Sequence, residues 1–201
     1  MKPDVTFSFG KNWKDFLATI DERVIAEAGK DIEDWLGTEN IRAKDIVDIG
    51  SGSGLSSLCI YHRGCRRLVS FDYDPHSVEA TKLLAERARL PDKWEIFQGS
   101  ILDDALINRL GTFDIVHSWG VLHHTGKMWQ AIDNAIRLCA PDGLLFLSIY
   151  AGGDQYEKHL ALKRRFNAAD ERTKAEMVRN LLQSTNSYYK PGGSSEGSTR
   201  H

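Results

Sequence analysis

The fold of this chain is decided by the stretch DIVDIGSGSGLSSLCI, residues 45–60. A short apolar run contains Asp48 near its end and leads into a turn with three alternating glycines, Gly50, Gly52 and Gly54. Glycine is used where the backbone needs a positive φ or where another group approaches closely. A glycine turn between a strand and a helix therefore predicts a ligand-binding loop, and a tight turn without ligand is the alternative.

Outward from this stretch, strands and helices alternate along the chain. The expected strands are residues 46–50, 66–72, 94–99, 113–119 and 143–150. The expected helices are residues 13–36, 54–63, 77–90 and 127–139, with a shorter one inside 101–110. We expect Gly29 to divide the first helical segment and Pro141 to open a turn before the last strand. This alternation predicts an α/β fold with a parallel sheet and helices on both of its faces.

After Tyr150 the pattern changes. Residues 154–183 are rich in Lys, Arg and Glu and predict one or two polar helices. The stretch that follows is rich in Gly and Ser, which is typical of a linker or a flexible tail. No sixth or seventh strand is predicted.

Composition excludes several functional classes. The net charge is −2, so the chain has no general attraction for nucleic acid or anionic membranes. No apolar run approaches the roughly 20 residues that span a bilayer, and the first residues have no apolar signal-peptide core. Three cysteines without a Cys-x-x-Cys pair favour reduced, mostly buried thiols over disulfides or a zinc site. We therefore expect a cytoplasmic protein without a metal.

Three ligands compete for the glycine loop. A phosphate loop ends in Gly-Lys-Ser or Gly-Lys-Thr, which this stretch lacks. The dinucleotide fingerprint needs its third glycine where Leu55 stands. The third pattern, Asp-x-Gly-x-Gly-x-Gly, is the nucleoside-binding loop of the class I S-adenosylmethionine methyltransferases, and residues 48–54 match it without a gap. S-adenosylmethionine carries an ammonium that Asp48 could hold directly or through water; the alternative is that Asp48 caps the next helix.

Polar residues also follow the next two strands, and ligands bind beyond the carboxyl ends of parallel strands. Asp72 ends the second strand and could accept both ribose hydroxyls of S-adenosylmethionine or of NAD. Tyr73 could pack on the adenine, or simply on the sheet edge. After the third strand, Ser100 stands where many methyltransferases hold the adenine amine, and the backbone amide of Ile101 could bind a ring nitrogen.

The stretch HSWGVLHHT, residues 117–125, ends the fourth strand. Its expected cofactor contacts are Ser118, Trp119 and Gly120. Because histidine titrates near neutral pH, His123 or His124 could take a proton from a substrate hydroxyl or amine. A structural role for the pair is the alternative. Adjacent histidines do not form the His-x-x-x-His face that binds zinc, so we expect no metal here.

Residues 45–150 resemble the core of the class I methyltransferases. Residues 7–13, FSFGKNW, and 113–135, FDIVHSWGVLHHTGKMWQAIDNA, make the chain similar to small-molecule methylases grouped with those of ubiquinone biosynthesis. The resemblance implies a Rossmann-like sheet, S-adenosyl-L-methionine as methyl donor, S-adenosyl-L-homocysteine as product, and a small-molecule oxygen or nitrogen as acceptor. Trp13 is expected in an N-terminal lid over the cofactor or as an anchor of the first helix. The implied loop contacts are Asp48, Gly50, Ser51, Gly52 and Gly54.

The family also implies seven strands, and this chain departs from it because strands 6 and 7 are not expected. A sheet with open edges could be completed by a second copy, so a homodimer is one expectation. The expected segments are 1–44, an N-terminal helical segment or lid; 45–150, the S-adenosylmethionine-binding core; 151–185, a helical cap; and 186–201, a flexible tail.

Two other functions stay open at this point. A degenerate domain could hold S-adenosylmethionine or S-adenosylhomocysteine without transferring a methyl group. An NAD-dependent oxidoreductase is less favoured, because Leu55 breaks its fingerprint. An RNA or protein methyltransferase ranks lower, because no Asn-Pro-Pro-Tyr motif and no basic extension is present.

Overall fold

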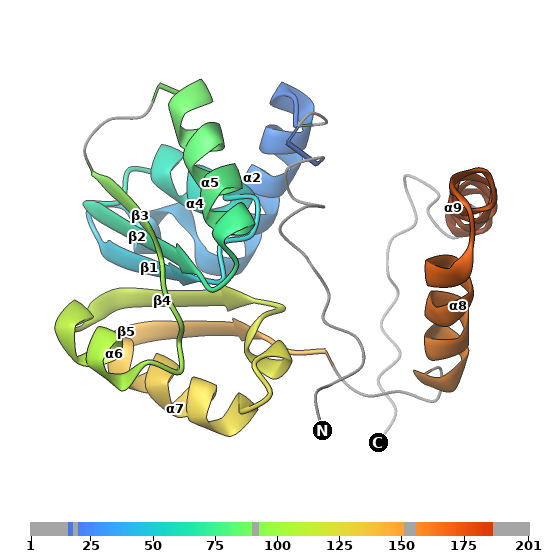
Figure 1. The fold of residues 1–201 in the computed structure, drawn as a ribbon. Helices are drawn as coiled ribbons and strands as arrows, with labels where there is room; N and C mark the ends of the chain where they lie inside the picture. Colours follow the sequence, from blue (N-terminus) through green and yellow to red (C-terminus); the bar gives the residue numbers. More distant parts are fainter. Residues whose placement is uncertain (1–15, 18–19, 90–92, 151–155, 187–201) are drawn as a thin grey trace, which may run out of the picture. The chain divides into compact units, whose positions relative to one another are not determined.

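The computed structural model describes residues 16–17, 20–89, 93–150 and 156–186 (Figure 1). The chain divides into two compact units, residues 1–150 and residues 151–201. The first unit holds the sheet and every predicted site residue.

The described part of the first unit contains a sheet of five strands in the order β3-β2-β1-β4-β5. All four pairings are parallel. The strands are β1 Asp45–Ile49, β2 Arg67–Asp72, β3 Trp94–Gln98, β4 Phe113–Trp119 and β5 Cys139–Ser148. The chain runs outward from β1 to β3 and then returns to β4 beside β1, so the strand order reverses between β1 and β4. In open α/β sheets ligands bind at this reversal, beyond the carboxyl ends of the strands.

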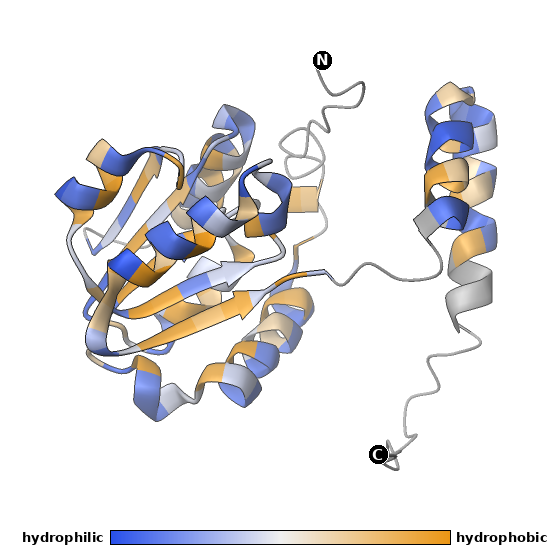
Figure 2. Ribbon diagram, turned by 90° about the horizontal axis from the view of Figure 1, so that it is seen from below, coloured by the Kyte–Doolittle hydropathy of each residue, from blue (hydrophilic) through white to orange (hydrophobic). Residues whose placement is uncertain are grey.

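Helices cover both faces of the sheet, with α2, α4 and α5 on one face and α6 and α7 on the other (Figure 1). Alternate residues of β1 enter two different cores: Ile46 packs with residues of α2 and α4, and Val47 packs with residues of α7. Figure 2 shows hydrophobic strands between helices that turn hydrophilic residues outward. The helices of this unit are α2 Glu22–Leu36, α3 Thr38–Ile41, α4 Leu55–His62, α5 Pro75–Arg87, α6 Asp104–Leu110, the 3₁₀ helix η1 Leu122–His124, and α7 Met128–Leu138. The predicted α/β class is confirmed.

The predicted helix break at Gly29 is wrong, because α2 runs through this residue without interruption. The side chain of Arg63 explains the glycine. Its guanidinium donates hydrogen bonds to the carbonyl of Gly29 and to the carbonyl of Cys59 in α4, the second at 2.9 Å. A Cβ at position 29 would lie 3.2 Å from Nη2 of Arg63. The glycine therefore lets a guanidinium join two helices.

The predicted turn at Pro141 lies inside β5 as an irregularity of the pairing. Phe113 pairs with Cys139 and Ile115 pairs with Leu144, so only Asp114 of β4 lies opposite residues 140–143. The residues between the two pairs form a bulge, which is a common place for proline and glycine in a strand.

The second unit contains the predicted polar helices, α8 Tyr156–Ala168 and α9 Glu171–Asn186. The predicted tail lies almost entirely outside the described residues. Strands 6 and 7 of the family's sheet do not occur among residues 16–17, 20–89, 93–150 and 156–186. Of the helices that the structure describes, none combines the length and apolarity required to cross a membrane.

Candidate functional site

The glycine loop after β1 adopts the positive φ angles that its sequence predicts. The φ values are 75° at Gly50, 57° at Gly52 and 81° at Gly54. A Cβ on Gly50 would also lie 2.5 Å from both Cγ atoms of Val121, which follows β4. The first glycine is therefore needed both for its backbone conformation and because the loops after β1 and β4 touch there.

A Gly50→Ala substitution should test this contact. We expect it to lower the free energy of unfolding by about 2–4 kcal/mol, the sum of a positive-φ penalty and an overpacking penalty. Gly64→Ala is the matched control, because Gly64 also has a positive φ, of 81°, but a Cβ there would have no neighbour within 4 Å. It should lose only the conformational part, about 1–2 kcal/mol. Urea unfolding of both variants decides the point, and equal losses would contradict a contact between the loops.

Asp72 lies at the end of β2, directly beside this loop. Its Oδ2 accepts a hydrogen bond from the backbone N–H of Gly52 at 3.0 Å, and its Oδ1 accepts one from the N–H of Asp74 at 2.9 Å. Burial raises the pKa of the Asp72 carboxyl, these two bonds oppose the rise, and the charges of Asp74 and Asp48 add to it. The β2 end thus fixes an acceptor group against the loop.

Asp48 is buried, and both of its carboxylate oxygens have partners inside the protein. Oδ1 lies 2.7 Å from Nδ1 of His117 on β4, and Oδ2 accepts a hydrogen bond from the hydroxyl of Ser57 in α4. The side chain is only 3% exposed. Asp48 therefore bonds to a side chain of α4 rather than capping its backbone. Its predicted contact with an ammonium group stays a prediction, and it has no support from these partners.

The predicted serine contacts also have partners within the protein. The Ser51 hydroxyl lies 3.0 Å from that of Thr81 in α5, and the Ser118 hydroxyl donates to the carbonyl of Ile49 at 3.1 Å. Ser100 accepts a hydrogen bond from the backbone N–H of Leu102 at 3.1 Å. The Ser118 bond joins the ends of β4 and β1, the Ser51 bond joins the glycine loop to α5, and the Ser100 bond lies within the turn after β3.

The remaining adenine candidates differ in exposure. The side chain of Ile101, after β3, is buried, and its carbonyl accepts a hydrogen bond from Asn134 in α7 at 2.8 Å. Tyr73, after β2, is 77% exposed. The exposed side chain of Tyr73 is therefore accessible to a ligand.

Trp119, at the end of β4, stacks on Trp35 of α2 with ring centroids 4.2 Å apart and planes 8° from parallel. Both rings also stack against Phe146 of β5. Helical spacing predicts Trp35 on the buried face of its helix, and this is wrong because the residue is 43% exposed. Trp13 lies outside the described residues, so its predicted place in a lid stays a prediction.

The histidine pair lies in η1, after β4. The rings of His123 and His124 have centroids 4.0 Å apart, and the ring of Tyr150 after β5 lies 4.6 Å from that of His123. Neither ring nitrogen of His123 has a hydrogen-bond partner among the residues whose positions are described. Burial, and to a lesser extent the charge of His124, lowers the pKa of His123. A neutral imidazole has one ring nitrogen with a lone pair, and this nitrogen is suited to accept a proton.

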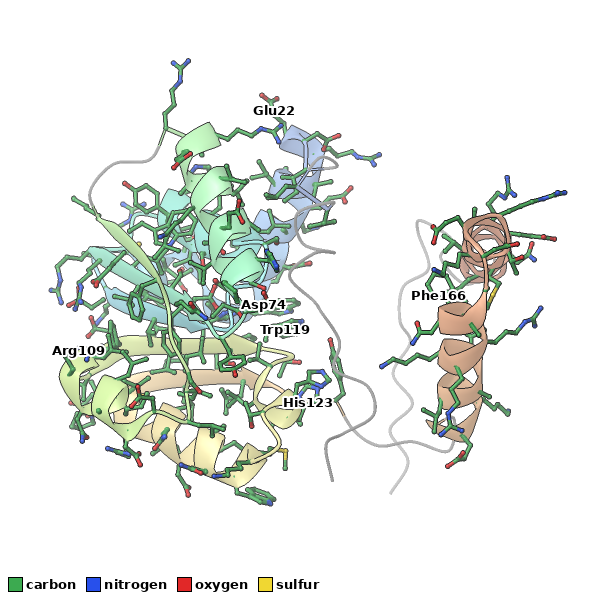
Figure 3. All side chains as sticks on the ribbon, viewed as in Figure 1. Glu22, Asp74, Arg109, Trp119, His123 and Phe166 are labelled. Atoms are coloured by element: carbon green, nitrogen blue, oxygen red, sulfur yellow. The ribbon has the colours of Figure 1, made fainter. Side chains whose placement is uncertain are left out.

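These groups meet at one end of the sheet. Figure 3 shows Asp74, Trp119 and His123 at the edge toward which the strands point. A Cβ on Gly120, which has a φ of 71°, would lie 2.9 Å from the hydroxyl of Tyr150, so the segments after β4 and β5 also touch. The structure thus brings together the predicted residues after β1, β2, β4 and β5.

Metal chemistry has no obvious ligands in the described ranges, where no three His, Cys, Asp or Glu side chains come together. The thiols of Cys59 and Cys65 are buried, and this burial raises the pKa of each to about 11. Neither thiol is positioned as a nucleophile.

A family model, the methyltransferase domain, matches residues 20–175. This chain belongs to the methyltransferase-domain family. Its fold is that of the class I methyltransferases, as the sequence predicts. The narrower likeness to ubiquinone-type methylases stays a prediction.

Solved structures share this fold at low sequence identity. A candidate S-adenosyl-L-methionine-dependent methyltransferase from Methanococcus maripaludis has a TM-score of 0.58 and 18% identity, over 92% of this chain and 88% of the other. An O-methyltransferase family protein from Burkholderia thailandensis has a TM-score of 0.57 and 19% identity, over 77% of this chain and 45% of the other.

Curated relatives match a short segment. The ribosomal protein L11 methyltransferase of Tolumonas auensis is 32% identical over 63 residues, which are 31% of this chain and 22% of the relative. That of Alteromonas mediterranea is 35% identical over 63 residues, with the same coverage of 31% and 22%. The matched segment of this chain thus spans about a fifth of the length of these relatives.

Proposed function

We propose that this domain binds S-adenosylmethionine and transfers its methyl group to an oxygen or nitrogen of a small molecule, with S-adenosylhomocysteine as the product. The observation that carries the proposal is the Asp72 carboxylate, which the N–H groups of Gly52 and Asp74 fix beside the glycine loop. Each carboxylate oxygen can accept two hydrogen bonds, and each already accepts one from a backbone N–H. The remaining capacity suits the two hydroxyls of a ribose.

The charges at this edge favour S-adenosylmethionine over a dinucleotide. Asp48 is close enough to Asp72 to raise its pKa, so two carboxylates lie under one loop. A sulfonium and an ammonium are attracted to such a site, whereas a pyrophosphate is repelled. The cofactor contacts that we propose are the loop residues Gly50, Ser51, Gly52 and Gly54 and the strand-end residues Asp72, Tyr73, Ser100, Ile101, Ser118, Trp119 and Gly120.

The transfer itself requires little acid catalysis. S-adenosylmethionine supplies an electrophilic methyl group, and the protein contributes mainly by holding an acceptor in line with it. An acceptor that arrives protonated must lose its proton as the new bond forms. His123 is our candidate for this base, because neither of its ring nitrogens has a hydrogen-bond partner in the described part of the chain and its lowered pKa keeps the ring neutral.

The curated relatives bear on the acceptor. They are named as methyltransferases of ribosomal protein L11, so a protein acceptor is the second candidate. We favour a small molecule because residues 113–135 resemble the small-molecule branch. A homodimer remains a prediction.

Calorimetric titration of the 201-residue chain with S-adenosylmethionine, S-adenosylhomocysteine and NADH tests the proposal. We expect micromolar binding of the first two ligands and none of NADH. Tight binding of NADH alone would refute it. Release of S-adenosylhomocysteine in the presence of phenols, amines or L11 protein then separates an enzyme from a non-catalytic binding domain and identifies the acceptor class.

A further inference from the structure

A buried chain of hydrogen bonds runs through the sheet beneath the glycine loop. Nε1 of Trp94 on β3 donates to the hydroxyl of Ser70 on β2 at 2.8 Å. The Ser70 hydroxyl lies 2.8 Å from that of Ser57 in α4, and Ser57 donates to Oδ2 of Asp48. Oδ1 of the same carboxylate lies 2.7 Å from Nδ1 of His117 on β4. The chain therefore links four neighbouring strands through side chains alone.

The hydrogens of this chain all point toward Asp48. Trp94 can only donate, so the Ser70 oxygen accepts from it. Ser57 uses its hydrogen on Asp48, so Ser70 must donate to Ser57. An ionised Asp48 accepts only, which places the His117 proton on Nδ1. The chain thus stabilises a buried anion, which would be costly without such donors.

The Asp48 carboxylate lies at the base of the glycine loop. Asp48 lies before the glycine loop and Ser57 lies after it, so their hydrogen bond closes the base of the loop. The His117 bond ties the same carboxylate to β4, which ends at Trp119 and is followed by the segment that carries His123. The ring of His117 is held in place by stacking on Phe146, with centroids 5.6 Å apart and planes 10° from parallel.

We propose that Asp48 and His117 are positioning residues: the pair fixes the glycine loop relative to the loop after β4, and Asp48 acts on the cofactor through the loop rather than by direct contact. The consequence of this positioning for cofactor binding rests on the function proposed above. The sequence pattern alone assigns Asp48 to the ammonium, whereas its partners assign it to the base of the loop.

Hydrogen exchange of the ligand-free protein tests the proposal independently of the cofactor. His117→Phe keeps an aromatic ring against Phe146 but removes the donor to Asp48. We expect amides of residues 50–58 and 118–124 to exchange about tenfold faster or more, as a lost hydrogen bond to a buried charge loosens the local structure. Amides of α6, Asp104–Leu110, should change no more than in the control.

The control is Ile115→Val, which trims a buried side chain two positions earlier on the same face of β4. It lowers general stability without touching the chain of hydrogen bonds. His117→Asn, whose amide places a donor near the position of Nδ1, should restore protection of the loop. Ser57→Ala, which removes the other donor, should loosen residues 50–58 even if His117→Phe fails to fold.

Exchange that rises equally in all elements, or that is no faster in residues 50–58 than in Ile115→Val, would overturn the proposal. The affinity for S-adenosylhomocysteine, measured on the same variants, should fall about tenfold in His117→Phe and recover in His117→Asn. A wild-type chain that binds neither S-adenosyl ligand would refute the proposed function, and the exchange result would still decide the role of the pair.

Discussion

Replacing Asp72 by asparagine should weaken the binding of S-adenosylmethionine about a hundredfold, because two hydrogen bonds to a charged carboxylate are lost or reduced. Asparagine keeps one carbonyl oxygen, but its NH₂ group replaces the other acceptor. That NH₂ group would face a backbone N–H that now donates to Asp72, and it could not accept a hydrogen bond from a ribose hydroxyl. Calorimetry with S-adenosylmethionine measures the effect. A circular-dichroism melt shows whether the variant remains folded.

Asp74→Asn is the matched control. It removes the same charge two residues away, and asparagine caps a helix as well as aspartate does. The cap of α5 depends on this side chain, which accepts a hydrogen bond from the N–H of His76 at 2.8 Å. The control should bind S-adenosylmethionine nearly as tightly as the wild type. Equal losses in the two variants would mean that general charge, and not the Asp72 carboxylate, holds the ligand.

The pH dependence of binding follows from the raised pKa of Asp72. Only the ionised carboxylate can accept both hydroxyls, so affinity should be complete above this pKa and fall as the pH drops through it. Burial places the fall above 3.8, the ordinary value of an aspartate. The folded chain holds this proton more tightly than the unfolded chain does, so ionisation of Asp72 lowers stability as the pH rises. The Asp72→Asn variant should lack both effects.

Most of the fold follows from local pattern. The alternation of apolar strands with amphipathic helices predicts the five described strands and the helices between them, because each signal lies within one short segment. Gly29 shows the limit. Helix propensity favours a break there, but the helix continues and the glycine leaves room for the guanidinium of Arg63, which is distant in the sequence. Single-segment rules cannot predict such a contact.

The candidate site shows the same division. The glycine loop and Asp72 were predictable because they lie at the carboxyl ends of strands, where ligands bind in open α/β sheets. The role of Asp48 was not, because its partners His117 and Ser57 come from β4 and α4. A polar residue such as His117 in the buried part of β4 was the available signal. Buried polar side chains usually have hydrogen-bond partners, so a partner for this histidine was to be expected nearby.

Replacing His123 by glutamine should lower kcat about a hundredfold or more for an acceptor that arrives protonated, such as a phenol, because general-base catalysis typically contributes that much. Glutamine retains hydrogen bonding but takes up no proton at these pH values. The affinity for S-adenosylmethionine should stay unchanged, since His123 lies in η1 and not in the glycine loop. Initial rates of S-adenosylhomocysteine release, together with calorimetry of each variant, measure the two effects separately.

The pH profile distinguishes a base from a residue that only packs. Because burial and His124 lower the pKa of His123 below its ordinary value of 6.5, the wild-type kcat should be constant at neutral pH and fall only below that value. His124→Gln is the matched control: it removes the neighbouring charge, so the fall should move to higher pH while the neutral-pH rate stays nearly the same. A His123→Gln profile that keeps the wild-type fall, or a His124→Gln variant that loses as much kcat, would exclude His123 as the base, because a base must carry both the rate and its titration.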